Sequence, residues 1–190
     1  MTSGVPDLGT GQSTVVLMGP MASGKSSVGA ELAQLLGADF IDIDVRVTSA
    51  HGPIPEIFAE RGEEGFRDLE AQAVADALTE EHPRGVVIAL GGGAVLREET
   101  RARLAGHQVV YLEVAWEDVA PRLAGSEDRP LLHGEAEKSW RELMDRRRPV
   151  YESVATLRVR AAGGTAAQVA QTVADQLSPV QKELSRERRH

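Results

Sequence analysis

GPMASGKS, residues Gly19–Ser26, has the spacing of a phosphate-binding P-loop, in which two glycines, a lysine and a hydroxyl residue follow in order. The apolar run TVVLM comes directly before it, and apolar residues at helical spacing follow Lys25. Strand, glycine-rich turn and helix therefore succeed one another as the motif requires. We expect Gly24 to turn backbone amides toward a phosphate, Lys25 to reach the outer phosphates, and Ser26 to offer its hydroxyl to Mg²⁺.

Short apolar runs alternate with longer amphipathic stretches along the rest of the chain, which is typical of parallel strands joined by crossover helices. The predicted strands are Thr14–Met18, Asp39–Ile43, Gly85–Leu90, Gln108–Val114 and Thr156–Arg160. The prolines expected where elements join are Pro53, Pro55, Pro83, Pro121 and Pro149. The pattern predicts a three-layer α/β/α fold around a five-stranded parallel sheet.

Composition indicates one packed domain. The chain has 190 residues, of which 42% are hydrophobic and 26% are charged. We expect this domain to span residues 14–177, between a flexible amino-terminal segment at 1–13 and a flexible carboxyl-terminal tail at 178–190. Residues 124–137, AGSEDRPLLHGEAE, are polar and interrupt a crossover, so we expect a mobile lid loop there. The alternative is a plain surface insertion.

Charge and composition also exclude some partners. The net charge of −8 should repel nucleic acid and anionic membranes, so any bound anion needs a local site. The absence of cysteine excludes disulfides and Cys-ligated zinc and suits a reducing compartment. No apolar run approaches the ~18 residues that a membrane span needs, and the amino terminus lacks the features of a secretory signal. We expect a cytoplasmic protein that binds neither nucleic acid nor membrane.

Two carboxylates and three glycines follow predicted strands. Asp42 and Asp44 are two residues apart, so in an extended strand both would face the same side, at the edge where parallel sheets bind ligands. One could lie near Mg²⁺ while the other accepts a proton from an attacking hydroxyl. The alternative is a pair of helix-capping aspartates. Gly91–Gly93 leave only backbone after the third strand, which suits amides turned toward an oxygen, or simply a tight turn.

Several arginines are candidates for binding anions. Arg67 stands at the start of a predicted helix, Arg129 lies in the lid loop, and Arg146–Arg148 form a run before a proline. An arginine can bind a carboxylate through two parallel hydrogen bonds, or neutralise charge at a transferring phosphoryl group. Solvated surface ion pairs are the alternative. We expect that simpler fate for Arg61, Arg101, Arg103 and Arg141.

Taken together, these motifs resemble those of shikimate kinases, small P-loop enzymes that phosphorylate shikimate with ATP on the way to chorismate and the aromatic amino acids. In chain order the matching stretches are GPMASGKSS, the DIDV pair, FAERGEEGFRDLE, LGGGAVL, DRPLL and RRRPVY. The resemblance extends from the first predicted strand to the last helix. It implies a P-loop kinase fold, transfer of the γ-phosphate of ATP to the 3-hydroxyl of shikimate, one Mg²⁺ ion, and a monomer.

The resemblance also implies roles at the acceptor side. Asp44 would bind the attacking hydroxyl and act as its base, and Gly92 would contact a ring hydroxyl through its backbone. Arg67 and Arg147 would hold the substrate carboxylate, with Arg148 as the fallback because three arginines compete for one role. The residues that would line the substrate pocket are Phe58, Phe66 and Glu70.

At the donor side, the resemblance implies that Ser26 and Asp42 hold Mg²⁺, directly or through water. Lys25 would bind the phosphates and Arg129 would close onto them with the lid. The implied ATP-binding residues are Met21, Ala22, Ser23, Gly24, Lys25, Ser26, Ser27, Arg122 against the adenine, and Arg129. Two stretches depart from the family's pattern: Pro20–Ala22, where further glycine is frequent, and the plain AAGGTAA at 161–167, where an adenine-contacting loop is frequent.

Other functions fit less well. A gluconate kinase is the nearest alternative, but its further motifs are missing and GFRDLE, GGG and RPLL would go unexplained. A nucleotide switch protein predicts an NKxD motif, which does not occur. An inactive relative is disfavoured because Lys25, Asp44, Arg67 and Arg129 are all present.

Overall fold

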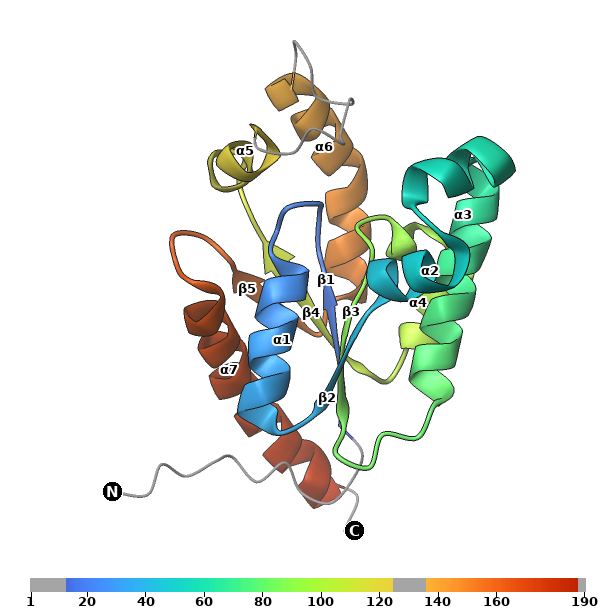
Figure 1. Cartoon of the computed structure of the whole chain (residues 1–190). Coiled ribbons are helices and arrows are strands. Elements are labelled where there is room, and N and C mark those ends of the chain that lie inside the picture. The colour runs from blue at the N-terminus through green and yellow to red at the C-terminus, as the bar shows by residue number, and fades with distance from the viewer. Residues whose placement is uncertain (1–12, 125–135, 188–190) are drawn as a thin grey trace.

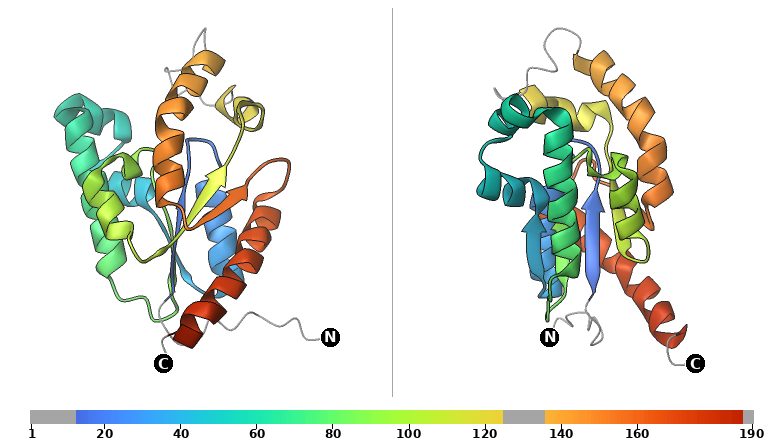
Figure 2. Two further views of the ribbon diagram at one scale, coloured as in Figure 1. Left: turned by 180° about the vertical axis from the view of Figure 1, so that it is seen from behind. Right: turned by 90° about the vertical axis from the view of Figure 1, so that its right-hand side faces the viewer.

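The computed structural model describes residues 13–124 and 136–187, and it shows a parallel sheet with helices on both faces (Figures 1 and 2). The strands are β1 (Thr14–Met18), β2 (Asp39–Asp42), β3 (Val86–Ala89), β4 (Gln108–Glu113) and β5 (Leu157–Arg160). All pairings are parallel, and the strand order is β2-β3-β1-β4-β5. The predicted three-layer, five-stranded fold is therefore confirmed.

Helices cover the sheet on both sides. They are α1 (Lys25–Leu36), α2 (Ile43–His51), α3 (Ile54–Thr79), α4 (Glu98–Leu104), α5 (Trp116–Ala124), α6 (Ala136–Val154) and α7 (Ala166–Glu187), with a 3₁₀ turn, η1 (Ala94–Leu96). Helix α1 packs against α7 on one face, and α6 packs against β4 and η1 on the other (Figure 2). None of the helices in the described ranges is long and apolar enough to cross a membrane.

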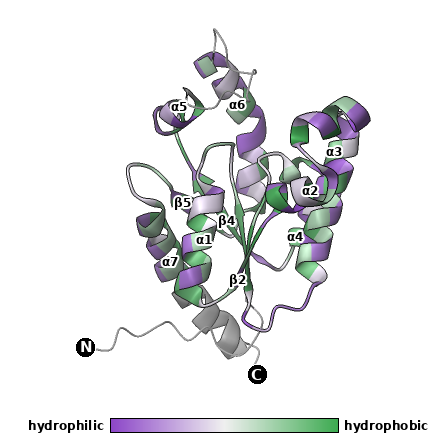
Figure 3. Ribbon diagram, in the orientation of Figure 1, coloured by the Kyte–Doolittle hydropathy of each residue, from purple (hydrophilic) through white to green (hydrophobic). Residues whose placement is uncertain are grey.

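The central strands are apolar because both of their faces are covered. Val15, Val16, Leu17 and Met18 of β1 are at most 1% exposed, and every residue of β3 is buried. Continuous apolar runs are typical of parallel strands between two helical layers. Figure 3 shows the resulting contrast between apolar strands and outer helices of mixed hydropathy.

The strand order places a ligand crevice beside β1. From β1 the chain crosses to β2 and β3 on one side, and it later continues to β4 and β5 on the other. Open α/β sheets bind ligands at such a reversal, outside the carboxyl ends of the strands. The P-loop follows β1 at that edge, and Gly91–Gly93 follow β3 there.

Some predicted boundaries are wrong. The second strand ends at Asp42 instead of Ile43, because the Asp42 carboxylate accepts a hydrogen bond from the Val45 amide at 3.2 Å and so caps α2. Pro121 and Pro149 lie inside α5 and α6 instead of at joins. Each proline costs one backbone hydrogen bond without ending its helix.

The predicted segments at the ends and at the lid also differ in part. Helix α7 continues to Glu187, so residues 178–187 are helical where a flexible tail was expected. In the expected lid of residues 124–137, Ala124 ends α5, while Ala136 and Glu137 begin α6. Residues 1–12, 125–135 and 188–190 lie outside the described residues, and the proposed domain limits stay a prediction.

Helix α3 bends at Gly62. There the backbone adopts φ 69° and ψ −178°, a conformation that only glycine adopts readily. The bend divides α3 into two helical segments. Arg67 lies early in the second one, five residues past Gly62, whereas the helix as a whole begins at Ile54.

Candidate active site

The P-loop forms a preorganised anion site between β1 and α1. Gly24 adopts a left-handed conformation with φ 89° and stands immediately before α1, so the amides of the first helical turn face the loop. The Lys25 side chain is 8% exposed, and its Nζ donates to the carbonyl oxygens of Gly19 at 3.0 Å and Pro20 at 2.8 Å. The ammonium group therefore lies inside the loop, where a phosphate would bind.

Ala22 makes this P-loop unusual. Its φ of 60° is left-handed, and no other non-glycine residue of the described ranges has a positive φ. Such a conformation costs a residue with a Cβ about 1–2 kcal/mol. The Arg122 Nη1 donates to the Ala22 carbonyl at 2.8 Å and so helps to hold the loop in this conformation.

The triple-glycine turn after β3 lies between the P-loop and the side chains of Glu70 and Asp44. A Cβ on Gly92 would lie 3.2 Å from the Met21 nitrogen of the P-loop. A Cβ on Gly91 would lie 2.1 Å from Glu70 Oε1 and 2.7 Å from Asp44 Oδ1. None of these glycines has a positive φ, so glycine is needed here for close approach and not for backbone conformation. The turn thus joins the phosphate loop to a group of acidic and basic side chains.

That group comes from α2 and α3. Arg67 Nη1 and Glu70 Oε2 form an ion pair at 2.7 Å, in which the side chains are only 14% and 2% exposed. Asp44 lies in the first turn of α2, so the extended geometry expected for it is wrong, although it still reaches the carboxyl edge of the sheet. Gly93 completes the contact, because a Cβ there would lie 2.5 Å from both terminal nitrogens of Arg67.

Glu70 is an unusual carboxyl group. Burial raises its pKa above the ordinary value of 4.5, the neighbouring Arg67 opposes this rise, and Asp44 adds to it. Its Oε1 has no hydrogen-bond partner among the described residues. A buried carboxyl beside a guanidinium holds that guanidinium in place. Removing the guanidinium would leave the buried carboxylate without a compensating charge and would destabilise the protein.

Of the three consecutive arginines, Arg147 faces the site. Its Nη1 donates to the Gly92 carbonyl at 3.2 Å, whereas Arg146 donates to Glu142 on its own helix and Arg148 is exposed. Sequence reasoning missed Tyr151, whose hydroxyl donates to the same carbonyl at 2.5 Å. The four-residue spacing from Arg147, which puts both side chains on one face of a helix, is the signal that could have found it.

The arginines expected on the surface mostly lie there. Arg103 pairs with Glu99, and Arg141 pairs with Glu137, each four residues away on the same helix. Arg101 differs, because its Nη1 donates to the carbonyls of Val95 and Leu96. It therefore holds the end of η1, close to the triple-glycine turn.

The Phe66 ring lies beside Arg67, and the Phe58 ring packs against Phe66. The rings of Phe58 and Phe66 are 4.9 Å apart, and the Arg67 guanidinium carbon lies 5.3 Å from the Phe66 centroid. Phe66 is buried, whereas Phe58 is 37% exposed. The guanidinium therefore has an apolar wall beside it.

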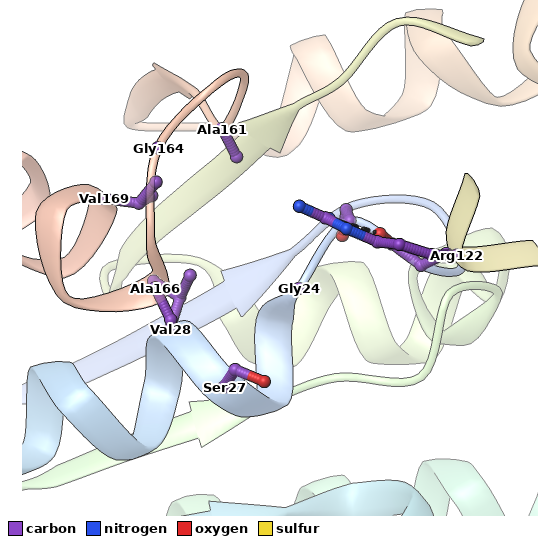
Figure 4. Close-up of a pocket in the computed structure, with 10 residues that line it drawn as sticks. Gly24, Ser27, Val28, Arg122, Ala161, Gly164, Ala166 and Val169 are labelled. Carbon is purple, nitrogen blue, oxygen red and sulfur yellow. Dashed lines mark hydrogen bonds between the residues drawn. The ribbon is translucent and has the colours of Figure 1, made fainter. Parts of the chain in front are cut away.

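A pocket of about 260 Å³ opens on the other side of the P-loop (Figure 4). Its lining residues are Ala22, Ser23, Gly24, Ser27, Val28, Arg122, Ala161, Gly164, Ala166 and Val169. Arg122 extends into it from α5, facing the loop that follows β5 (Figure 4). That loop is the AAGGTAA stretch. It follows the carboxyl end of a strand, as do the P-loop and the triple glycine. This position indicates a ligand-binding loop, although the plain composition of the stretch shows no binding motif.

The remaining candidate residues are two serines of α1, the aspartate that caps α2, and an arginine of the expected lid. Ser26 and Ser27 are exposed in the first turn of α1, and Asp42 caps α2 with one carboxylate oxygen. Arg129 lies outside the described residues. Within the residues that the structure covers, no three His, Asp or Glu side chains gather as they would around a metal held by protein alone.

The chain is similar to known proteins over most of its length. The family model described as "Shikimate kinase" matches residues 21–178. A shikimate kinase of Thermobifida fusca is 45% identical over 163 residues, which are 85% of this chain and 93% of that protein. The structure of shikimate kinase from Acinetobacter baumannii in complex with shikimate aligns with a TM-score of 0.82 and 34% identity, over 88% of this chain and 94% of that one. A gluconokinase from Sinorhizobium meliloti aligns with a TM-score of 0.63 over 93% of this chain and 97% of that one, but at 20% identity it shows a common fold only.

Proposed function

The chain belongs to the shikimate kinase family, and from this premise we propose how its residues transfer the γ-phosphate of ATP to the 3-hydroxyl of shikimate. The protein is an ATP:shikimate phosphotransferase. One observation carries the proposal for its site: the triple-glycine turn contacts the P-loop through Gly92, and contacts Asp44, Glu70 and Arg67 through the glycines on either side. A phosphate site and a site for a hydroxylated acid therefore share one wall.

At the donor side, the P-loop amides and Lys25 would bind the triphosphate, with the amino-terminal end of α1 directed at it. The base would enter the pocket between Arg122 and the loop at 161–166, where small apolar residues leave room for a flat ring. Met21, Ser23 and Ser27 would complete the contacts along the loop. Arg129, from the expected lid, would neutralise charge on the transferring phosphoryl group.

The residues present also suit Mg²⁺. Ser26 offers a hydroxyl beside Lys25, and Asp42 has a second carboxylate oxygen besides the one that caps α2. Magnesium prefers hard oxygen ligands and takes many of them from water and phosphate, so two protein oxygens suffice. When bound there, Mg²⁺ would supply neutralisation of the negative charge on the triphosphate.

At the acceptor side, Arg67 and Arg147 would hold the carboxylate of shikimate. Glu70 fixes Arg67 through its 2.7 Å ion pair, so the guanidinium is held in position before substrate arrives. Phe58 and Phe66 would cover an apolar edge of the ring.

Asp44 would receive the proton of the 3-hydroxyl as its oxygen attacks the γ-phosphorus. In the same step the bond between the γ-phosphorus and the oxygen that bridges the β- and γ-phosphates breaks. ADP leaves with the electron pair of that bond. Because phosphoryl transfer needs little covalent help, alignment and charge neutralisation by these groups would supply most of the rate.

The finer biological setting is also a proposal. We expect the enzyme to act as a monomer in the cytoplasm, with residues 14–177 as its catalytic domain and a lid within 124–137. The absence of cysteine and the net charge of −8 support a reducing compartment and no polyanionic partner.

A panel of small acceptors in a coupled ADP-release assay tests the function. With ATP and Mg²⁺, shikimate should give strong turnover, while gluconate and a no-acceptor control should give background rates. Strong turnover of gluconate with none of shikimate would replace the proposal with the alternative that shares this fold.

A further inference from the structure

The Gly92 carbonyl oxygen receives two hydrogen bonds from one helix. The Tyr151 hydroxyl donates to it at 2.5 Å, and Arg147 Nη1 donates to it at 3.2 Å. Both side chains come from the same face of α6, one helical turn apart. Both lone pairs of this oxygen are therefore engaged, and the middle of the triple-glycine turn is tied to α6.

Tyr151 is itself firmly held. Its side chain is 0% exposed, and its ring packs against Tyr111 of β4 with centroids 5.1 Å apart. Tyr111 pairs in register with Met18, the last residue of β1 before the P-loop. Burial raises the pKa of Tyr151, so its O–H group stays protonated and can donate at neutral pH. The hydrogen bond to Gly92 thus starts from a helix side chain that is held against the sheet by Tyr111.

Gly92 also lies directly against the P-loop. A Cβ at this position would be 3.2 Å from the Met21 nitrogen and 3.6 Å from the Gly19 carbonyl oxygen. The neighbouring glycines contact Asp44, Glu70 and Arg67. Any shift of the turn would therefore change the separation between the phosphate loop and the acceptor side chains.

We propose that Tyr151 is a positioning residue for phosphoryl transfer, which sets the gap between donor and acceptor by fixing the carbonyl of Gly92. The inference rests on the proposed function, because it assigns the two sides of the turn to ATP and shikimate. Arg147 cannot fully replace the tyrosine, since its guanidinium is also needed for the substrate carboxylate. Misplacement by a fraction of an ångström affects the transfer step more than the binding of either substrate.

The test compares Tyr151→Phe with Tyr111→Phe. Each change removes the hydroxyl of a buried tyrosine and keeps the ring stack, but within the described residues only the Tyr151 hydroxyl makes a hydrogen bond. We expect Tyr151→Phe to lower kcat about tenfold, with the KM values for ATP and shikimate changed by less than about threefold. Tyr111→Phe should keep the wild-type kcat. Thermal midpoints are recorded for both, and rates are measured well below the lower one, so that all protein is folded.

The possible outcomes distinguish a failure of the inference about Tyr151 from a failure of the proposed function. A lower thermal midpoint with an unchanged kcat would show a purely structural tyrosine and overturn the inference. A higher KM for shikimate at unchanged kcat would also overturn it, because the hydroxyl would then support binding and not the gap. If the wild-type protein shows no shikimate-dependent ADP release, the proposed function fails and the inference fails with it. Normal turnover in the wild type and in Tyr151→Phe alike would refute the inference alone.

Discussion

Adding one methyl group at Gly93 should disable the acceptor site while leaving the donor site intact. The Cβ of Gly93→Ala would lie 2.5 Å from both Nη1 and Nη2 of Arg67, whereas ordinary contacts begin at 3.4 Å. The backbone tolerates alanine there, because φ is −111°. The conflict is thus purely one of space, and the guanidinium must move by about 1 Å.

The magnitude follows from that displacement. Arg67 is held by Glu70 at 2.7 Å, so it cannot retreat without weakening a buried ion pair. A shift of about 1 Å in a substrate-positioning group costs on the order of 100-fold in kcat/KM, which equals about 2.7 kcal/mol of transition-state binding. The Gly93 side of the turn faces away from the P-loop contact made by Gly92, so the KM for ATP should change by less than about threefold.

Steady-state kinetics with each substrate varied in turn measure both quantities, and circular dichroism verifies that the variant is folded. Arg67→Lys serves as a comparison, because it keeps the charge but loses the planar fork, and should lose kcat/KM for shikimate in the same direction. If Gly93→Ala retained kcat/KM for shikimate within about threefold of wild type, Arg67 would not be the carboxylate-binding group described above.

Three further predictions concern other parts of the site. Asp44→Asn should bind ATP normally in a titration but lose about 10²- to 10⁴-fold in kcat, because the attacking hydroxyl loses its proton acceptor; near-normal turnover would remove Asp44 as the base. Arg122→Ala should raise the KM for ATP about tenfold, because it removes a charged hydrogen bond to the P-loop and the side chain against which the adenine would stack. An unchanged KM for ATP would show that the adenine binds elsewhere. Glu70→Gln should change the pH dependence of stability. Because burial raises the folded pKa of Glu70 above 4.5, wild-type stability should fall relative to Glu70→Gln as pH rises from 4.5 through that raised value, and parallel urea-unfolding curves across this range would contradict the assignment.

The fold was largely predictable because its signals are local. An apolar run followed by GPMASGKS specifies a strand, a turn and a helix start within 13 residues, Thr14–Ser26, and alternating apolar and amphipathic stretches specify the rest. The errors occur where one local rule competes with another or is relaxed. Asp42 ends its strand by capping a helix, and Pro121 and Pro149 are tolerated within helices.

The residues of the candidate site could be proposed from the sequence, but their mutual geometry could not. Arg67, Asp44 and the triple glycine belong to recognisable motifs, yet their mutual contacts depend on two separate crossovers, β2–β3 and β3–β4, that meet at one edge of the sheet. The role proposed for Tyr151 could not be read from composition, because an aromatic residue two positions after a proline is ordinary in a core helix. Its meaning comes from a hydrogen bond to a carbonyl 59 residues away in the chain.

Analysis of the reaction product by ³¹P NMR tests the central claim most directly. Purified protein with ATP, Mg²⁺ and shikimate should convert the γ-phosphate signal into one new phosphomonoester signal, coupled to the ring proton at carbon 3 of shikimate, with ADP formed in equal amount. Release of inorganic phosphate alone, or a phosphomonoester that forms with gluconate and not with shikimate, would contradict the account.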